Sequence, residues 1–189
     1  MSRRMVALLI ATVVIIVAIV GGLTLGGVHT SPNTTLSPTA SVLSPAYARS
    51  VGFSKTYRAA TKQAVTTEKG CSTTVEAIYE DSARKTGLIS SLLKCKSAAA
   101  ASAVLASFRK QVRIDSAIKI PSQLGQSALA TASNAPEYLM AWQVGSGVAL
   151  LAVDTDIAAS SKSVTATPIS KSQTKVLVDS AVEQNSLYN

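Results

Sequence analysis

The feature that most constrains this chain is an apolar segment near its N-terminus. Residues 5–28 read MVALLIATVVIIVAIVGGLTLGGV and contain no charged side chain. As an α-helix, at about 1.5 Å per residue, this segment would extend roughly 36 Å, more than the roughly 30 Å of a bilayer's hydrocarbon core. The sequence therefore predicts one transmembrane helix over residues 5–28, with the lipid bilayer as its first partner.

Charge around that segment predicts its orientation. Arg3 and Arg4 precede it, and no basic residue follows until Arg49. By the positive-inside rule, residues 1–4 form a cytoplasmic tail and the C-terminal part of the chain is extracytoplasmic. The alternative is a cleaved secretory signal, but the apolar region of such a signal usually runs about 7–15 residues before its cleavage site. We therefore expect a retained, single-pass signal anchor in the cell membrane.

Composition divides the rest of the chain in two. Residues 29–44 read HTSPNTTLSPTASVLS, rich in Ser, Thr and Pro and free of charged side chains apart from the single histidine, His29. Such a segment buries too little apolar surface to offset its ordering entropy, so we expect an extended stalk. Residues 45–189 have the length of one ordinary domain, and we expect one extracytoplasmic globular domain there.

The domain begins with a helical pattern. After Ser44, a candidate cap, and Pro45, a favourable first helical position, apolar residues recur at helical spacing. These residues are Phe53, Tyr57, Ala60 and Ala64. A helix of about 15–20 residues would present a basic stripe on its other face, suited to anionic headgroups or to solvent. The stripe consists of Lys55, Arg58 and Lys62.

Further along, alternation predicts strands. Residues 75–80 and 88–93 form one expected hairpin, and residues 137–144 and 148–155 flank Gly145-Ser146-Gly147 as another. A short strand near 127–132 is a further candidate. Amphipathic helices are expected after Ser97 and after Ser172. Together these elements predict an α+β fold with an antiparallel sheet of four to five strands and helices packed mainly on one face.

The two cysteines predict a disulfide. Cys71 lies just before the first expected strand and Cys95 at the end of its hairpin partner. Strands paired in the simplest register bring these ends together, and an extracytoplasmic compartment favours oxidation. The spacing is not C-x-x-C, so a structural bridge is favoured over a redox-active pair.

No motif predicts a catalytic residue, a cofactor or a metal site. The single histidine falls in the expected stalk, which excludes a His-based triad in the domain. Carboxylates remain as candidate acid–base groups: Glu76, Glu80, Asp81, Asp154 and Asp156. Asp154 and Asp156 are also conceivable as a weak cation site, but strand-end solvation is the favoured interpretation.

One apolar stripe has two interpretations. Tyr138, Met140 and Trp142 alternate along one expected strand and therefore share a face. The favoured interpretation is that they belong to the core. The alternative is that they form the aromatic wall of a ligand groove.

The net charge of +8 raises the question of an anionic partner. Nucleic acid is not expected, because the lysines are scattered and no aromatic platform interleaves with them. Anionic lipid headgroups or wall polymers fit an extracytoplasmic basic domain better.

The sequence divides, in order, into a short Arg-Arg leader, a Val/Ala/Ile span, a Thr/Pro stalk and a small domain with two cysteines. In this architecture the chain resembles extracytoplasmic proteins of actinobacterial cell envelopes. The resemblance implies a single-span envelope protein and assigns no functional residue. The function we expect first is a non-enzymatic interaction module, as an accessory subunit of a membrane protein complex or a contact to an envelope component. The alternatives are a small-ligand-binding or sensor-like domain, and a hydrolase that uses acidic residues.

Overall fold

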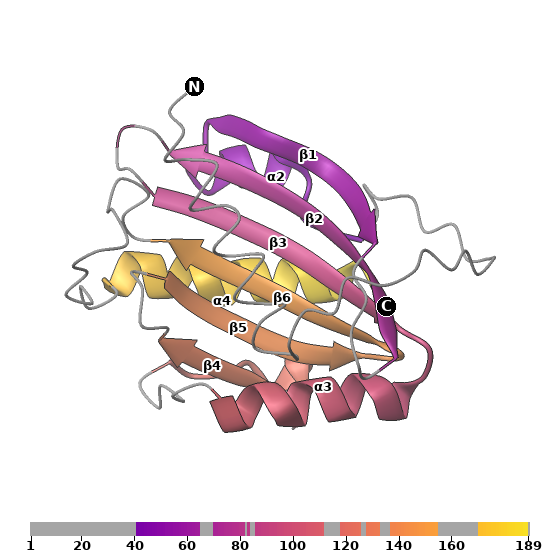
Figure 1. The fold of residues 1–189 in the computed structure, drawn as a ribbon. Helices are drawn as coiled ribbons and strands as arrows, with labels where there is room; N and C mark the ends of the chain where they lie inside the picture. Colours follow the sequence, from indigo (N-terminus) through magenta and orange to yellow (C-terminus); the bar gives the residue numbers. More distant parts are fainter. Residues whose placement is uncertain are drawn as a thin grey trace.

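One antiparallel sheet of six strands organises the structure, which is a computed structural model, in the order β1-β2-β3-β6-β5-β4 (Figure 1). The structure describes residues 41–64, 70–81, 83, 86–111, 118–125, 128–132, 137–154 and 170–188. In chain order the elements are α2 (Pro45–Ser50), β1 (Lys55–Ala64), β2 (Cys71–Asp81), β3 (Thr86–Cys95), α3 (Ala98–Gln111), the 3-10 turn η2 (Ser122–Leu124), β4 (Leu129–Ala132), β5 (Glu137–Val144), β6 (Gly147–Asp154) and α4 (Lys171–Ser186).

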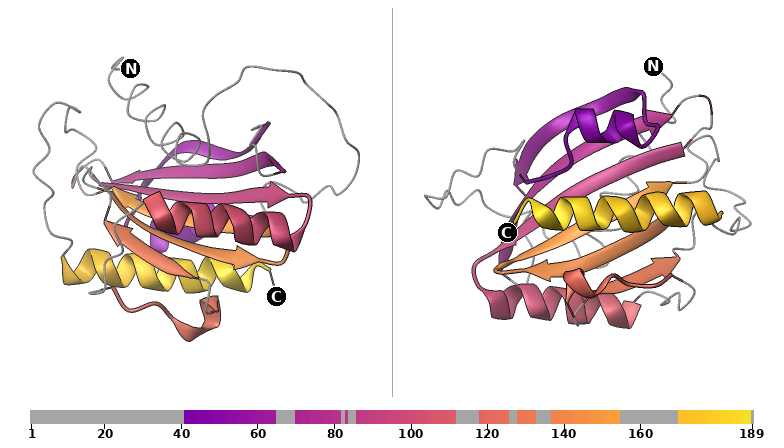
Figure 2. Two further views of the ribbon diagram at one scale, coloured as in Figure 1. Left: turned by 60° about the horizontal axis from the view of Figure 1, so that its bottom comes forward. Right: turned by 180° about the vertical axis from the view of Figure 1, so that it is seen from behind.

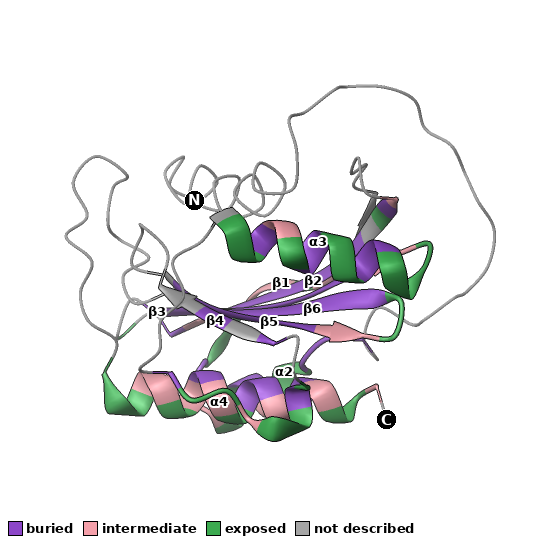
Figure 3. Ribbon diagram, turned by 90° about the horizontal axis from the view of Figure 1, so that it is seen from below, coloured by how far each residue is buried: buried purple, intermediate pink, exposed green. Residues whose placement is uncertain are grey.

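Helices cover both faces of this sheet. Figure 3 shows α3 on one face and α2 with α4 on the other. Seen from behind, α4 runs across the middle of the sheet and α2 lies near β1 (Figure 2). The expected α+β class is confirmed, but there are six strands, not four to five, and the helices are not mainly on one face. Neighbouring residues along the central strands are buried, such as Leu88 with Ile89 on β3 and Leu150 with Leu151 on β6. Because neighbouring side chains point to opposite faces, both faces of the sheet are apolar and both need helices packed against them.

The expected long first helix is wrong. Helix α2 ends at Ser50, and Gly52 follows with φ of 103°, a conformation that glycine adopts at low cost and that turns the chain out of the helix. The next residues form edge strand β1, which pairs with β2. Tyr57 and Ala60 pack into different apolar clusters on opposite sheet faces, as alternation along a strand requires.

The basic residues of the expected stripe therefore lie on an edge strand. Lys55 and Lys62 are exposed. Arg58 contacts the Glu76 carboxylate, with 3.3 Å between its Nη1 and Oε1. The pairing register between β1 and β2 shifts on both sides of Arg58, so this edge of the sheet is irregular. Contact of these residues with an anionic surface remains a prediction.

The expected hairpins and later helices are confirmed. Strands β2 and β3 pair from Cys71 with Cys95 to Asp81 with Thr86, and β5 and β6 pair across the turn at residues 145–146. Ser97 Oγ accepts a hydrogen bond from the Ala100 N–H at 3.1 Å, as expected of a cap for α3. Helix α4 is capped by Ser170, which lies two residues before Ser172, the residue after which the helix was expected.

The disulfide between Cys71 and Cys95 is present, with a sequence separation of 24. The two cysteines are register partners at one end of the β2–β3 pair. The expected geometry is therefore confirmed.

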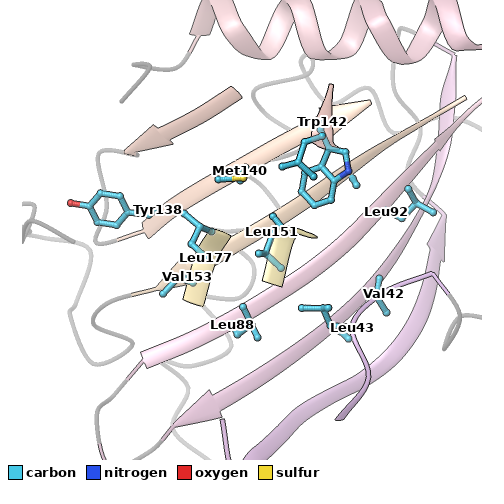
Figure 4. Close-up of a cluster of buried hydrophobic side chains, with 14 of the residues drawn as sticks. Val42, Leu43, Leu88, Leu92, Tyr138, Met140, Trp142, Leu151, Val153 and Leu177 are labelled. Carbon is cyan, nitrogen blue, oxygen red and sulfur yellow. The ribbon is translucent and has the colours of Figure 1, made fainter. Parts of the chain in front are cut away.

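The stalk boundary needs correction, because residues 41–43 belong to the folded domain. Val42 and Leu43 are 1% and 2% exposed and join the core cluster beneath α4 (Figure 4). The Leu43 N–H donates to Ser90 Oγ at 2.9 Å, and the Leu43 carbonyl accepts from the Tyr79 hydroxyl at 2.5 Å. The domain thus begins at or before Ser41.

A buried polar network ties this N-terminal segment to α4. Ser90 Oγ donates to Gln184 Oε1 at 3.0 Å. Gln184 Nε2 in turn donates to the Ser91 carbonyl at 3.0 Å and to the Tyr188 hydroxyl at 3.1 Å. Tyr188 donates to the Ser41 carbonyl at 2.6 Å. The entry point of the chain and the last helix are therefore held to the same strand, β3.

The expected transmembrane helix, residues 5–28, lies outside the described residues, as do the cytoplasmic tail at 1–4 and most of the stalk. Within the part of the chain that the structure describes, no helix combines the length and hydropathy needed to span a bilayer.

Candidate ligand pocket

A pocket of about 440 Å³ opens at one end of the sheet, on the face that α4 covers. It lies where β2 ends and β3 begins, under the first turn of α4. Its size falls within the roughly 300–1,000 Å³ typical of small-molecule sites. The lining residues come from the α2–β1 connection, from β2, β3 and β6, and from α4: Val51, Gly52, Phe53, Asp81, Thr86, Val153, Ser170, Ser172, Gln173 and Val176.

The first turn of α4 supplies one wall. Ser170 and Gln173 form a capping box, in which Ser170 Oγ accepts from the Gln173 N–H at 3.2 Å and Gln173 Oε1 accepts from the Ser170 N–H at 2.9 Å. The first intrahelical bond runs from the Thr174 N–H to the Ser170 carbonyl at 2.9 Å. The N–H groups of Lys171 and Ser172 therefore have no intrahelical acceptor, and the helix presents partial positive charge there.

The ends of β2 and β3 supply the opposite wall. Asp81 and Thr86 are register partners, and both are at least nine-tenths buried. The Asp81 carboxylate accepts a hydrogen bond from the Ala83 N–H at 3.1 Å. Thr86 lines the pocket, and its hydroxyl is not one of the buried side-chain atoms without a hydrogen-bond partner in the described residues, which belong to Thr61, Ser91 and Ser180.

Apolar side chains complete the lining. Phe53 is 5% exposed and Val153 is 1% exposed, and both belong to the core cluster beneath α4. Val51 and Val176 are partly buried against the same cluster. A Cβ built at Gly52 would meet no atom within 4 Å, so glycine stands here for its positive φ and leaves the space beside it open. The pocket therefore combines an apolar floor with polar groups on two sides.

The expected groove residues lie in the core and outside this pocket. Met140 and Trp142 are completely buried, and Tyr138 is 5% exposed (Figure 4). Trp142 Nε1 donates to Asn185 Oδ1 of α4 at 2.9 Å. None of the three lines the pocket, although Tyr138 is the register partner of Val153, which does. Their environment matches the core interpretation.

Three of the expected acid–base carboxylates lie at one end of the sheet, where Glu80 and Asp154 are both register partners of Gly87 and Asp81 is the partner of Thr86. Glu76 is 2% exposed on β2, Asp81 lines the pocket, and Asp154 ends β6. Asp156 lies outside the described residues. In the described part of the chain, no group of three or more His, Cys, Asp and Glu side chains is placed to hold a metal ion.

Burial changes the titration of Glu76. Desolvation raises the pKa of this carboxyl above its usual value of 4.5, and the charge of Arg58 opposes the rise. Since the pKa is higher in the folded protein than in the unfolded chain, the protonated form favours folding. This contribution is complete below about pH 4.5 and is lost as the pH rises through the raised pKa.

We therefore expect the Glu76→Gln variant to gain stability relative to the native protein as the pH rises above about 4.5. Denaturant unfolding of both proteins between about pH 4 and pH 8 measures the difference. The variant Glu183→Gln, which removes an exposed carboxyl of α4, controls for the loss of one negative charge. A stability difference that does not change with pH would contradict the assignment.

Sequence reasoning missed this pocket, although one of its walls had a signal. The pattern Ser170-x-x-Gln173 is a capping-box signature and marks the start of α4. Thr86 and Asp81 carried no signal of their own, because their proximity to α4 depends on how the sheet and the helix pack.

Comparisons of the chain with protein-family models, with curated proteins and with solved structures found no match. The fold and the pocket are therefore the basis for a functional proposal.

Proposed function

We propose that this chain is a membrane-anchored, extracytoplasmic domain that binds a small polar molecule without transforming it chemically. Two functions were favoured by the sequence, an accessory interaction module and a small-ligand-binding or sensor-like domain. The observation that favours the second is the pocket at the start of α4, which has polar groups of the sheet and of the helix in its walls and apolar side chains between them.

The construction of the pocket supports ligand binding. Five separate segments contribute to its wall, so a bound molecule would contact groups that belong to both the sheet and α4. The Ser41–Leu43 segment is hydrogen-bonded through Tyr188 and Gln184 to the other end of α4. Contacts made by a ligand at the start of α4 would therefore be made to the same helix that holds the chain's entry point. This arrangement suits a tethered receptor or sensor.

The extracytoplasmic placement is supported by two features of the chain. The first is the apolar, uncharged segment at residues 5–28 with its preceding arginines. The second is the disulfide between Cys71 and Cys95, since such bridges persist in oxidising compartments.

Filling the pocket tests this function without assuming the chemistry of the ligand. We expect Ser172→Trp to place an indole in the pocket mouth and to abolish ligand-induced stabilisation. A library of small polar compounds, both charged and neutral, is screened by thermal unfolding of the full-length protein. At 100 times its Kd, a ligand stabilises the folded state by about 2.7 kcal/mol, which raises the Tm by several degrees.

The matched control is Ser186→Trp, an exposed serine at the other end of the same helix. Compounds that stabilise the native protein should stabilise this control and should leave Ser172→Trp unchanged. If no compound of any class stabilises the native protein, the ligand-binding function is wrong and the accessory-subunit function takes its place. Equal stabilisation of Ser172→Trp would place binding elsewhere on the domain.

A further inference from the structure

We infer that one end of the sheet lies against the surface of an anionic bilayer. The contact surface, which we call the basic rim, consists of Lys62, Lys94, Lys119, Ile120 and Leu187. This inference rests on the membrane anchor of the proposed function, and it adds which face of the domain meets the lipid headgroups. The placement of lysines, of exposed apolar side chains and of the chain's entry point supports it.

A row of register partners places Lys62 at this end of the sheet. The row runs from β1 to β5 through Lys62, Val75, Leu92, Ala149 and Trp142. Register partners point to the same face of a sheet, and the last four of these residues belong to the core cluster beneath α4. Lys62 therefore lies at the edge of the face that α4 covers, near the end of the sheet that holds the disulfide.

The two ends of the sheet differ in charge. Beyond the row, toward the disulfide, the described strand residues include Lys94, the register partner of Gly147, and no acidic residue. The opposite strand ends carry Glu80, Asp81, Glu137 and Asp154. A bilayer with anionic headgroups therefore attracts the first end and repels the second.

The C-terminal end of α4 reaches the same level as the row. Trp142 Nε1, at the β5 end of the row, donates to Asn185 Oδ1 at 2.9 Å. Asn185 Nδ2 in turn donates to the Gln123 carbonyl at 3.2 Å, which holds η2 beside the helix. Figure 2 shows the C-terminal end of α4 at the same end of the sheet as the turn between β5 and β6. The residues just before η2 and just after Asn185 therefore belong to the basic rim.

Exposed apolar side chains lie at this end. Leu187, the C-cap of α4, is 40% exposed and Ile120 is 37% exposed, and these are the exposed large hydrophobic side chains of the described residues. Lys119 is exposed beside Ile120. Such a mixture suits a bilayer surface, because lysines meet the phosphate groups and apolar side chains meet the acyl chains. Glu183, one helical turn before Leu187, is also exposed and confines the contact to the end of α4.

The chain enters the domain at the same end. The Ser41 carbonyl accepts a hydrogen bond at 2.6 Å from the hydroxyl of Tyr188, which directly follows Leu187. Residues 29–40 separate Ser41 from the expected span, and at about 3.3–3.6 Å per residue this connection reaches at most about 45 Å. The connection to the membrane therefore starts from the end of the domain that carries the basic rim, and it keeps that end near the bilayer.

The experiment measures backbone hydrogen exchange of the full-length protein in lipid nanodiscs of phosphatidylcholine, with or without phosphatidylglycerol. We expect slower exchange at residues 118–125 and 185–188 in the anionic nanodiscs alone. High salt should remove this protection, because it screens the contact. Exchange at Glu80 and Asp81 should be the same in both lipids. Equal exchange of the basic rim in both lipids, or protection of the acidic end instead, overturns the inference.

Neutralising the lysines of the basic rim tests which charges make the contact. In the triple variant Lys62→Gln, Lys94→Gln, Lys119→Gln, the ratio of docked to undocked domain should fall about fivefold for each lysine lost. The protection in anionic nanodiscs should then disappear.

The matched control is Lys55→Gln, Lys110→Gln, Lys171→Gln, which removes the same net charge elsewhere. Lys55 is the register partner of Glu80 at the acidic end, Lys110 ends α3 on the other face, and Lys171 begins α4. This control should keep the protection. An equal loss in both triple variants would show that net charge and not the basic rim holds the domain to the bilayer, and would overturn the inference.

Failure of this inference is distinguishable from failure of the proposed function. Carbonate extraction of membranes tests the anchor, and the compound screen tests the pocket. A protein that carbonate releases would overturn the anchor and this inference with it. Unprotected rim residues in a protein that stays in the bilayer would overturn this inference alone.

Discussion

Replacing Trp142 by alanine is expected to lower the free energy of unfolding by about 3–5 kcal/mol. The indole is completely buried between β5 and α4, in the cluster that also contains Met140, Leu151 and Leu177 (Figure 4). Its removal leaves a cavity that this closely packed layer fills only partly. It also takes away the donor for Asn185 Oδ1.

Denaturant unfolding followed by far-UV circular dichroism measures this loss, because the variant has no tryptophan left to report by fluorescence. Trp142→Phe keeps most of the apolar volume and should be destabilised much less, by about 1–2 kcal/mol. A loss of less than about 1 kcal/mol in Trp142→Ala would show that the residue is not part of the core. It would then reopen the groove interpretation of Tyr138, Met140 and Trp142.

Removing the disulfide is expected to have the next largest effect. The double variant Cys71→Ala, Cys95→Ala should lose about 3 kcal/mol, because the bridge closes a loop with a sequence separation of 24 and so restricts the unfolded chain. Chemical reduction of the native protein should lower its unfolding midpoint to that of the double variant. Reduction without any change in the midpoint would contradict a stabilising role for the bridge.

The elements that sequence predicted correctly share a strong local pattern. Parts of the β2–β3 hairpin and most of the β5–β6 hairpin alternate or run apolar, and α3 carries apolar residues at helical spacing after a cap. Their pairing is mostly between neighbours in the chain, so local information was enough. The disulfide followed from the same hairpin, because the β2–β3 register alone brings Cys71 and Cys95 together.

The elements that sequence predicted wrongly had ambiguous local patterns. Residues 53–64 carry apolar side chains at helical spacing, yet residues 55–64 form an edge strand after the positive φ of Gly52. Val42 and Leu43 stand among serines and threonines, so composition placed them in the stalk. Their burial depends on Tyr79, Ser90 and Gln184, of which the last is more than 140 residues away along the chain.

The pocket could not be predicted from local sequence patterns, for the same physical reason. Its lining comes from residues 51–53, 81, 86, 153, 170, 172, 173 and 176, and no segment contributes more than a few of them. Asp81 and Thr86 line the pocket together with the first turn of α4, and this proximity is a property of the packed molecule. The sequence offered a ligand groove only as the alternative interpretation of Tyr138, Met140 and Trp142, and none of these three residues lines the pocket.

The sequence by itself determined the apolar N-terminal segment, the α+β class, the two central hairpins and the cysteine pair, because each depends on periodicity or on neighbours in the chain. Only the tertiary structure decided the sixth strand, the two-sided covering of the sheet, the first residues of the domain and the pocket at the start of α4. These features depend on contacts between side chains that are far apart in the sequence. The free energy of burying such side chains together comes from several segments at once, and no one segment's local sequence pattern shows which other segments it will contact.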